Sequence, residues 1–271
     1  MAGRELSSIR SPRVKAARRL AKRAFRRREN RFLAEGPQAV REALAMDGVL
    51  VELFTTADAE GRHQDLVTQA EKSGVPIFRV GAEVMAELAQ TVTPQGLLAV
   101  CGFVDVPLES VLTPAPRLVT VLAHVRDPGN AGTVLRTADA AGSNSVIFTD
   151  ASVDPYNGKC VRASAGSLFH LPVVMGARFD AVVPALKEAG LTVVAADGEG
   201  EASLDTALAA GTLDGPTAWV FGNEAWGLPE EILAAVDEVV RVPIYGGAES
   251  LNLATAAAVC LYASARAQRA G

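Results

Sequence analysis

Apolar runs alternate with amphipathic stretches along most of the chain. In the first third, four short apolar runs are typical of strands, and three segments with apolar residues every three or four positions are typical of helices. The predicted strands are 31–34, 49–55, 76–80 and 97–103, and the predicted helices are 37–46, 64–73 and 82–90. Residues 105–116 break the pattern with three prolines, which predicts a linker.

The alternation resumes at Arg117. Strands are predicted at 118–123, 145–149, 172–175, 191–195, 217–221 and 239–242, and helices at 131–141, 158–168, 179–189, 229–235 and 251–266. Nearly continuous apolar strands separated by helices imply a parallel sheet covered on both faces. We therefore predict an α/β protein with a smaller domain over 1–104, a linker over 105–116 and a larger domain over 117–271.

Charge is distributed very unevenly. Residues 1–31 hold twelve Lys and Arg against two acids, a net of +10, whereas the rest of the chain has a net charge of −15. Basic residues recur every three or four positions, which predicts a charged stripe along one helix and a polyanionic partner such as RNA. The predicted RNA contacts are Arg18, Arg19, Lys22, Arg23, Arg26, Arg27 and Arg28. The alternatives are a solvated helix or an arm paired with the acidic body.

Composition excludes several classes of protein. No apolar run reaches the length of a membrane span, and the basic N-terminus lacks the apolar core of a signal peptide, so we expect a cytoplasmic protein. The three cysteines and three histidines are scattered without metal-ligand spacing, so no metal site is expected. A nicotinamide-dependent dehydrogenase is disfavoured because no Gly-x-Gly-x-x-Gly follows a predicted strand.

Three of the loops after predicted strands carry unusual groups of glycine and polar residues. They are 127–132, 221–229 and 243–253. Asn130 and Arg136 follow the first strand closely enough to approach one site, and Ser250 is suited to cap the last helix. Because ligands bind parallel sheets at the loops that follow the strands, the three loops together predict a binding site.

Each of these residues also has an ordinary structural interpretation. Asn130 could cap its helix, Arg136 could pair with Asp139, and Glu224 could lie at the N-terminal end of the helix at Pro229. The segment 243–253 could be a turn before a capped helix.

In three places the residues resemble the SpoU, or TrmH-like, branch of the SPOUT RNA methyltransferases. The first motif is Asn130-x-Gly132-x-x-x-Arg136-Thr137-Ala138, the second is Phe221-Gly222-Asn223-Glu224-x-x-Gly227-Leu228, and the third is Pro243-Ile244-x-Gly246-x-x-x-Ser250-Leu251-Asn252-Leu253. The stretch 162–169 also resembles the family, and the N-terminal part is similar to the L30e-like substrate-binding domain of the family. Two departures are Ile244, where the family commonly has Met, and Ala123-His124, where it commonly has Asp-Gly. The second departure leaves the role of His124 open.

The resemblance implies an RNA 2′-O-ribose methyltransferase that uses S-adenosylmethionine, with a trefoil knot in the C-terminal domain. The implied catalytic residues are Asn130, Arg136, Glu224, Ser250 and Asn252, and the implied cofactor contacts are Phe221, Gly222, Asn223, Gly227, Val242, Ile244, Ser250, Leu251 and Leu253. It also implies a homodimer, with the basic N-terminal domain presenting the RNA. We expect 23S ribosomal RNA as the substrate. The alternatives are transfer RNA, or a non-catalytic RNA-binding role in ribosome assembly.

Overall fold

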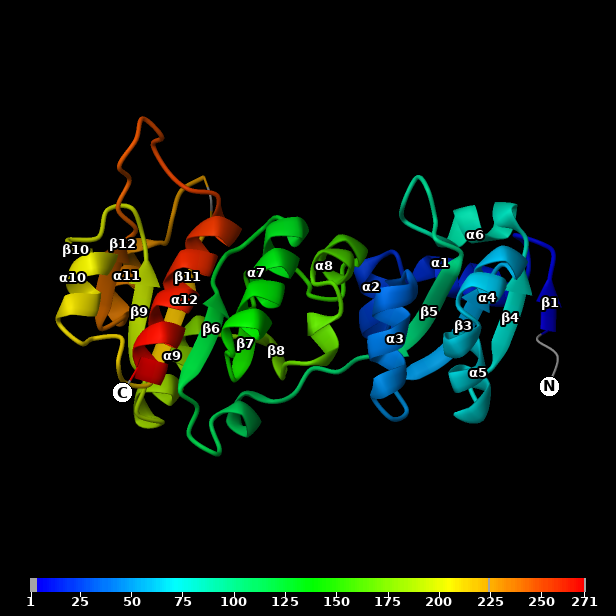
Figure 1. Ribbon diagram of the computed structural model, residues 1–271, viewed down its shortest axis with the longest axis horizontal. Helices are drawn as coiled ribbons and strands as arrows, with labels where there is room; N and C mark the ends of the chain where they lie inside the picture. The colour runs from blue at the N-terminus through cyan, green and yellow to red at the C-terminus, as the bar shows by residue number, and fades with distance from the viewer. Residues whose placement is uncertain (1–3, 224, 271) are drawn as a thin grey trace. The chain divides into compact units, whose positions relative to one another are not determined.

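The computed structural model describes residues 4–223 and 225–270, and these form two compact units (Figure 1). The first unit comprises the chain up to Val104 together with Tyr156–His170, and the second comprises Asp105–Pro155 and the chain from Leu171 onward. The contacts thus group residues 156–170, which the sequence pattern placed in the C-terminal domain, with the first unit. Tyr156 connects these residues to the first unit. Its ring stacks on Phe103 with 3.9 Å between the ring centroids, and its hydroxyl accepts a hydrogen bond from the Val104 amide at 2.7 Å.

The first unit is built on a mixed five-stranded sheet. In spatial order its strands are β1 (Arg4–Leu6), β4 (Ile77–Val80), β3 (Leu50–Thr55), β5 (Leu97–Gly102) and β2 (Arg31–Glu35), with β5 antiparallel to both neighbours. Its helices are α1 (Pro12–Arg19), α2 (Arg23–Glu29), α3 (Pro37–Ala45), α4 (Ala57–Arg62), α5 (Gln64–Lys72), α6 (Ala82–Leu88), α8 (Gly158–Ala163) and the 3₁₀ turn η2 (Ser167–Phe169). Val14 of α1, Leu20 directly after α1 and Leu88 of α6 are buried in one cluster with Phe54 and Val100 of the sheet.

The basic segment folds as two helices, so the single charged stripe predicted from the sequence is wrong. Helix α1 ends at Arg19, and Leu20, directly after it, is buried in the core with 4% of its surface exposed. The Arg26 guanidinium then donates to the carbonyls of Leu20 and Ala21 at 3.0 and 2.9 Å, which satisfies the end of α1. Arg26 is only 2% exposed and holds the helices together, so it is not placed to contact RNA as expected.

The second unit confirms the predicted parallel sheet. Its seven parallel strands are, in order, β10 (Ala202–Ser203), β12 (Glu238–Arg241), β9 (Thr192–Ala196), β11 (Thr217–Phe221), β6 (Leu118–Leu122), β7 (Ser145–Thr149) and β8 (Val173–Ala177). The helices are α7 (Pro128–Ala141), α9 (Phe179–Glu188), α10 (Leu204–Ala209), α11 (Glu230–Ala235), α12 (Leu253–Ala270) and the 3₁₀ turn η1 (Leu108–Val111). Alternate residues of β11 face opposite ways: Val220 packs with α9 and α11, and Trp219 points to α12.

No helix in the described parts of the chain is long and apolar enough to cross a membrane. Within the same residues, no group of three or more His, Cys, Asp or Glu side chains is arranged to hold a metal ion.

One buried hydrogen bond fastens α12 to the sheet and gives a stability prediction. The Trp219 indole N–H donates to the Ser264 hydroxyl at 2.8 Å, and both residues are fully buried. Ser264→Ala should lower the free energy of unfolding by about 1–3 kcal/mol, because the indole donor is left without a partner. In urea denaturation, the double variant Ser264→Ala/Trp219→Phe should lose less stability than the sum of the losses in the two single variants. Fully additive losses would show that the hydrogen bond contributes nothing.

Candidate active site

Four neighbouring strands of the second unit end at one edge of the sheet. The segments that follow β12, β9, β11 and β6 are 242–252, 197–201, 222–229 and 123–127. The segment 242–252 leaves β12 and leads to α12, which packs on α7, so it crosses the ends of β9 and β11 (Figure 1). The motifs predicted from the sequence are therefore brought to one edge. A knot in this part of the chain stays a prediction.

The segment after β11 forms a closed turn. Asn223 and Gly227 exchange backbone hydrogen bonds with N···O distances of 3.0 and 2.9 Å. Gly222 packs so closely that a Cβ atom there would lie 2.6 Å from Leu228 Cγ and 2.7 Å from the Gly227 carbonyl oxygen. Asp197, after β9, accepts from the Leu228 amide at 3.2 Å, so two adjacent strands fix this turn. The predicted catalytic residue Glu224 lies outside the described residues.

The segment after β6 is joined to this turn. The Asn223 side-chain amide donates to the His124 carbonyl at 3.3 Å, and His124 has a left-handed backbone with φ of 60°. The Ser152 hydroxyl donates to the Leu122 carbonyl at 2.7 Å and accepts from the Val125 amide at 3.3 Å. These two bonds fix the backbone on both sides of His124. His124 therefore has a structural role through its backbone. Neither Ser152 nor Asp197 was predicted from the sequence as part of this site. Asp197 could have been identified, because it is a carboxylate directly after a strand.

The two motif asparagines meet where α7 and α12 begin. The Asn252 side-chain amide donates to Asn130 Oδ1 at 3.2 Å, which connects residues 122 positions apart. The expected cap at Ser250 is wrong, and the alternative in which Asn130 caps its helix is not formed. Asp127, not Asn130, caps α7 by accepting from the Asn130 amide at 2.8 Å, and Asn252, not Ser250, accepts from the Ala254 amide at 2.9 Å in the first turn of α12. Ser250 itself is exposed.

Arg136 lies on the exposed face of α7. It is six residues beyond Asn130, so the two are about 9 Å apart along the helix axis. Among the described residues the Arg136 guanidinium has no hydrogen-bond or ion-pair partner, so the alternative pairing with Asp139 is not formed. Within the described chain its donors are therefore open to a ligand that binds along the exposed face of α7.

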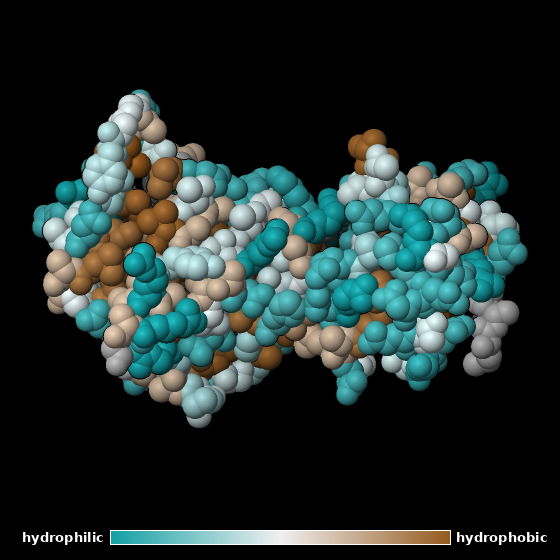
Figure 2. All heavy atoms as spheres, viewed as in Figure 1, coloured by the Kyte–Doolittle hydropathy of each residue, from teal (hydrophilic) through white to brown (hydrophobic). Residues whose placement is uncertain are grey.

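The predicted cofactor contacts fall into two groups. Phe221, Asn223 and Leu253 are 1%, 7% and 7% exposed and lie at the edge with Gly222 and Gly227, while Val242 and Leu251 are half-buried. Ile244, in contrast, is 37% exposed and belongs to the segment 244–250, which projects into solvent. Figure 2 shows apolar surface gathered beneath this projecting segment. The structure thus brings the contacts at the edge together, whereas Ile244 and Ser250 lie in the projecting segment.

In the described part of the chain, a side chain near the start of the projecting segment attaches this segment to α10 (Leu204–Ala209). The Tyr245 hydroxyl donates to Asp205 Oδ2 at 2.8 Å, and this carboxylate raises the pKa of Tyr245. Within the described chain, the backbone N–H and C=O groups of 243–251 form no hydrogen bonds with other backbone groups. Main-chain donors and acceptors without backbone partners, at the same edge of the sheet as the buried Phe221 and Leu253, fit the recognition of a flat, polar-edged adenine ring.

The predicted RNA contacts of the first unit differ in availability. Arg18 pairs with Glu87 at 2.6 Å and Arg28 with Glu29 at 2.7 Å. Four other predicted contacts are exposed and have no carboxylate partner in the described part of the chain; they are Arg19, Lys22, Arg23 and Arg27. Of these two pairs only Arg18–Glu87 joins the basic segment to the acidic part of the chain, because Glu29 belongs to the basic segment itself.

Comparison with known proteins agrees with this geometry. Residues 117–262 match the SpoU rRNA Methylase family, and residues 11–99 match the MRM3-like substrate binding domain. The chain is 32% identical over 259 residues to the 23S rRNA (guanosine(2553)-2′-O)-methyltransferase RlmP of Bacillus subtilis, covering 96% of this chain and 98% of that protein. It is 33% identical over 225 residues to the 23S rRNA (guanosine-2′-O-)-methyltransferase RlmB of Bordetella pertussis, covering 81% and 90%.

Solved structures are similar over nearly the whole chain. An AdoMet-bound rRNA methyltransferase from Sinorhizobium meliloti is similar with a TM-score of 0.85 at 30% identity, covering 97% of each chain. The SpoU methyltransferase AviRb from Streptomyces viridochromogenes is similar with a TM-score of 0.79 at 26% identity, covering 96% of this chain and 98% of that one. The family and the fold class predicted from the three motifs are confirmed: this chain belongs to the SpoU rRNA methylase family.

Proposed function

We propose that this protein transfers the methyl group of S-adenosylmethionine to a ribose 2′-hydroxyl of 23S ribosomal RNA. The observation that carries the proposal is the sheet edge where Asn130 and Asn252 meet, together with Arg136, which is exposed further along α7 and has no partner among the described residues. The buried Phe221 and Leu253 and the free main chain of 243–251 supply the adjoining wall. The names of the relatives favour ribosomal over transfer RNA.

The cofactor would be held by the motif residues after β11 and β12. Phe221 and Leu253 offer an apolar wall, Gly222 and Gly227 allow the backbone to approach closely, and the main chain near Ile244 and Leu251 offers donors and acceptors, with Val242 and Ser250 beside it. When bound, S-adenosylmethionine supplies a methyl group on a sulfonium whose positive charge is lost on transfer, so exclusion of water favours the reaction. The segment 244–250 would have to fold over the edge to exclude that water.

Arg136 would act on the RNA. A guanidinium has five N–H donors and no acceptor, so it stabilises negative charge instead of removing a proton. We assign it the orientation of the ribose and its neighbouring phosphate, and stabilisation of the oxyanion that develops at the 2′-oxygen. Asn130 and Asn252 fix the start of α7 relative to α12 and so position Arg136, and Glu224 and Ser250 are assigned to the same end of the site.

We also propose that the protein forms a homodimer through α7 and α12. Val259 and Tyr262 are 39% and 46% exposed on α12, and the helix is otherwise rich in alanine, which suits close packing against a second copy. Light scattering after size-exclusion chromatography should give twice the mass of the chain. A monomer at micromolar concentration would contradict this part of the proposal.

Transfer of a labelled methyl group tests the function directly. Purified protein, labelled S-adenosylmethionine and unmodified 23S RNA should yield 2′-O-methyl label at one position, which should also be lost from total RNA of cells without the gene. Unmodified transfer RNA serves as the competing substrate. Label on transfer RNA alone would overturn the choice of substrate, and no S-adenosylmethionine binding would overturn the enzyme activity.

Arg23 and Arg27 of α2 have no carboxylate partner in the described part of the chain, and this predicts a salt effect. Changing Arg23 and Arg27 to Gln together should weaken RNA binding and reduce the slope of log K against log salt by about 1.5, because two phosphate contacts are lost. Fluorescence anisotropy over a salt series measures this slope. The matched control changes Arg41 and Arg62 to Gln, since both already pair with carboxylates in the same unit. An unchanged slope in the first double variant would show that α2 does not touch phosphate.

A further inference from the structure

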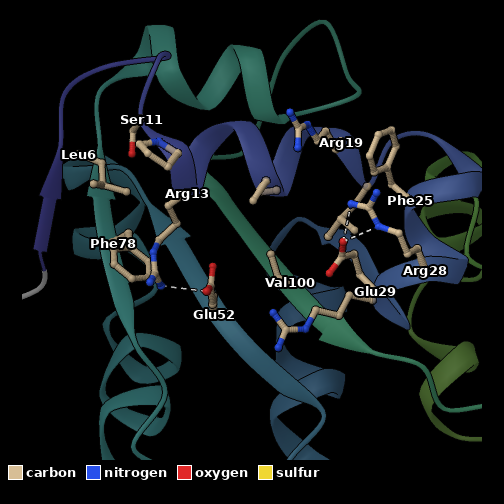
Figure 3. A pocket seen from close by; sticks show the side chains of 15 residues that line it. Leu6, Ser11, Arg13, Arg19, Phe25, Arg28, Glu29, Glu52, Phe78 and Val100 are labelled. Atoms are coloured by element: carbon tan, nitrogen blue, oxygen red, sulfur yellow. Dashed lines mark hydrogen bonds and ion pairs between the residues drawn. The ribbon is translucent and has the colours of Figure 1, made fainter.

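The first unit contains a hollow of about 510 Å³ where α1 crosses the sheet (Figure 3). Its floor is apolar and comes from both layers: Leu20 follows α1, Phe78 belongs to β4 and Val100 belongs to β5, and all three are at most 4% exposed. Arginine side chains line its mouth; they are Arg13, Arg19, Arg28 and Arg31. An apolar floor of this size below charged groups suits a small organic ligand with a polar edge.

An aromatic ring with cations beside it stands at one end of the hollow. The guanidinium carbons of Arg28 and Arg19 lie 4.8 and 5.6 Å from the centre of the Phe25 ring, and Phe25 is half-buried. At the other end, the Arg13 guanidinium lies over the ring of Phe78 at 4.4 Å (Figure 3). Aromatic rings and guanidinium planes are the surfaces on which proteins stack unpaired nucleobases.

The charges in the hollow fit the two parts of a nucleotide. Arg13 pairs with Glu52 at 2.8 Å and Arg28 with Glu29 at 2.7 Å, whereas Arg19 and Arg31 have no carboxylate partner among the described residues. Two carboxylates disfavour a simple anion, and several charged side chains disfavour a purely apolar ligand. Carboxylates accept from the amino groups of bases, and free guanidinium groups bind phosphate.

We propose that this hollow binds one unpaired nucleotide of the substrate RNA. The base lies beneath α1 against Phe25 and the apolar floor, and Arg19 and Arg31 bind the adjoining phosphate. The proposal rests on the function proposed above, because it takes the ligand to be the RNA that is methylated. A base in a duplex is stacked and paired and cannot enter, so the site selects an unpaired nucleotide and helps to choose the segment presented for methylation.

Filling the hollow without changing any charge tests the proposal. Ala16 is exposed and lines the hollow, so Ala16→Phe places a ring inside it. Ala24 is equally exposed on α2 but does not line it, so Ala24→Phe is the matched control. The probe is a fluorescein-labelled, mixed-sequence single-stranded RNA of about 12 nucleotides, long enough for one binding groove. The same strand annealed to its complement is the second probe.

Fluorescence anisotropy with the full chain should show a Kd for the single strand raised about tenfold in Ala16→Phe and unchanged in Ala24→Phe, since stacking of one base contributes about that much. Binding of the duplex should change less than twofold. An unchanged single-strand Kd in Ala16→Phe, equal losses in both variants, or an equal loss for the duplex would each overturn the site. Substituting 5-iodouridine into the probe adds an independent result: photocrosslinking should join it to Phe25, and a crosslink elsewhere would contradict the assignment.

Calorimetry with S-adenosylmethionine separates the two proposals. Ala16→Phe should bind S-adenosylmethionine with wild-type affinity, because the hollow belongs to the first unit and the motif loops to the second. Failure of the wild-type protein to bind S-adenosylmethionine would refute the proposed enzyme function and leave the RNA-binding result standing. Unchanged RNA binding in Ala16→Phe would refute only the nucleotide site.

Discussion

Arg136→Ala should lower the rate of methyl transfer to RNA by about 10²–10³-fold, the usual effect of removing one donor that stabilises a developing oxyanion. The structure gives the reason: Arg136 is exposed on α7 and has no partner within the described chain, so its donors are not engaged in stability. Single-turnover transfer of a labelled methyl group measures this rate directly. Arg136→Lys should recover only part of it, because an ammonium lacks the planar fork of donors.

Two further measurements decide what a loss of activity means. S-adenosylmethionine affinity and the unfolding midpoint of Arg136→Ala should match the wild type, since Arg136 is outside the predicted cofactor contacts. Arg178→Ala is the matched control, because Arg178 is an exposed arginine of the same unit that already pairs with Asp180. If Arg136→Ala binds S-adenosylmethionine normally and still methylates RNA at the wild-type rate, the assigned role is wrong.

The strands and the parallel sheet of the second unit could be predicted from the sequence because their signal is local. Thr217–Phe221 and Ser145–Thr149 are fully buried runs, and a run buried on both faces is apolar at every position or nearly so. Short helices were harder to predict from the sequence. Ala57–Arg62 and Leu204–Ala209 are only six residues long, which is too short for a clear helical period, and both were missed.

The break in the basic segment depends on tertiary structure. The repeat of arginines predicted one exposed helix, but Leu20 is drawn into the core and Arg26 folds back onto its carbonyl. The residue type does not show whether an arginine is buried and structural or exposed and free to bind RNA, so the sequence alone did not distinguish Arg26 from Arg27. The same applies to Tyr156, whose stacking on Phe103 brings 156–170 into the first unit.

The structure brings the predicted motifs to one edge of the sheet, but the contacts within that edge could not be predicted. The pair Asn130 and Asn252 is 122 residues apart, and nothing local shows that their side chains meet. Capping was misassigned for a similar reason. Asp127, Asn130, Ser250 and Asn252 all have side chains that cap helices, and the choice among them depends on where the backbone enters the helix.

Gly222→Ala should reduce S-adenosylmethionine affinity about 10- to 100-fold, because the added Cβ would lie 2.7 Å from the Gly227 carbonyl oxygen and 2.6 Å from Leu228 Cγ. Asn223 and Gly227 are locked together by two backbone hydrogen bonds, so the carbonyl cannot yield without opening the turn.

Gly198→Ala provides the matched control for this change. Gly198 follows the neighbouring strand β9 at the same edge, and a Cβ there would meet nothing within 4 Å. Calorimetry should therefore show wild-type affinity for Gly198→Ala and a large loss for Gly222→Ala, while urea denaturation shows that both are folded. A folded Gly222→Ala with unchanged affinity would mean that the turn after β11 is not a wall of the cofactor site. The cofactor would then have to bind against the segment after β12 alone, whose residues 244–250 are exposed to solvent.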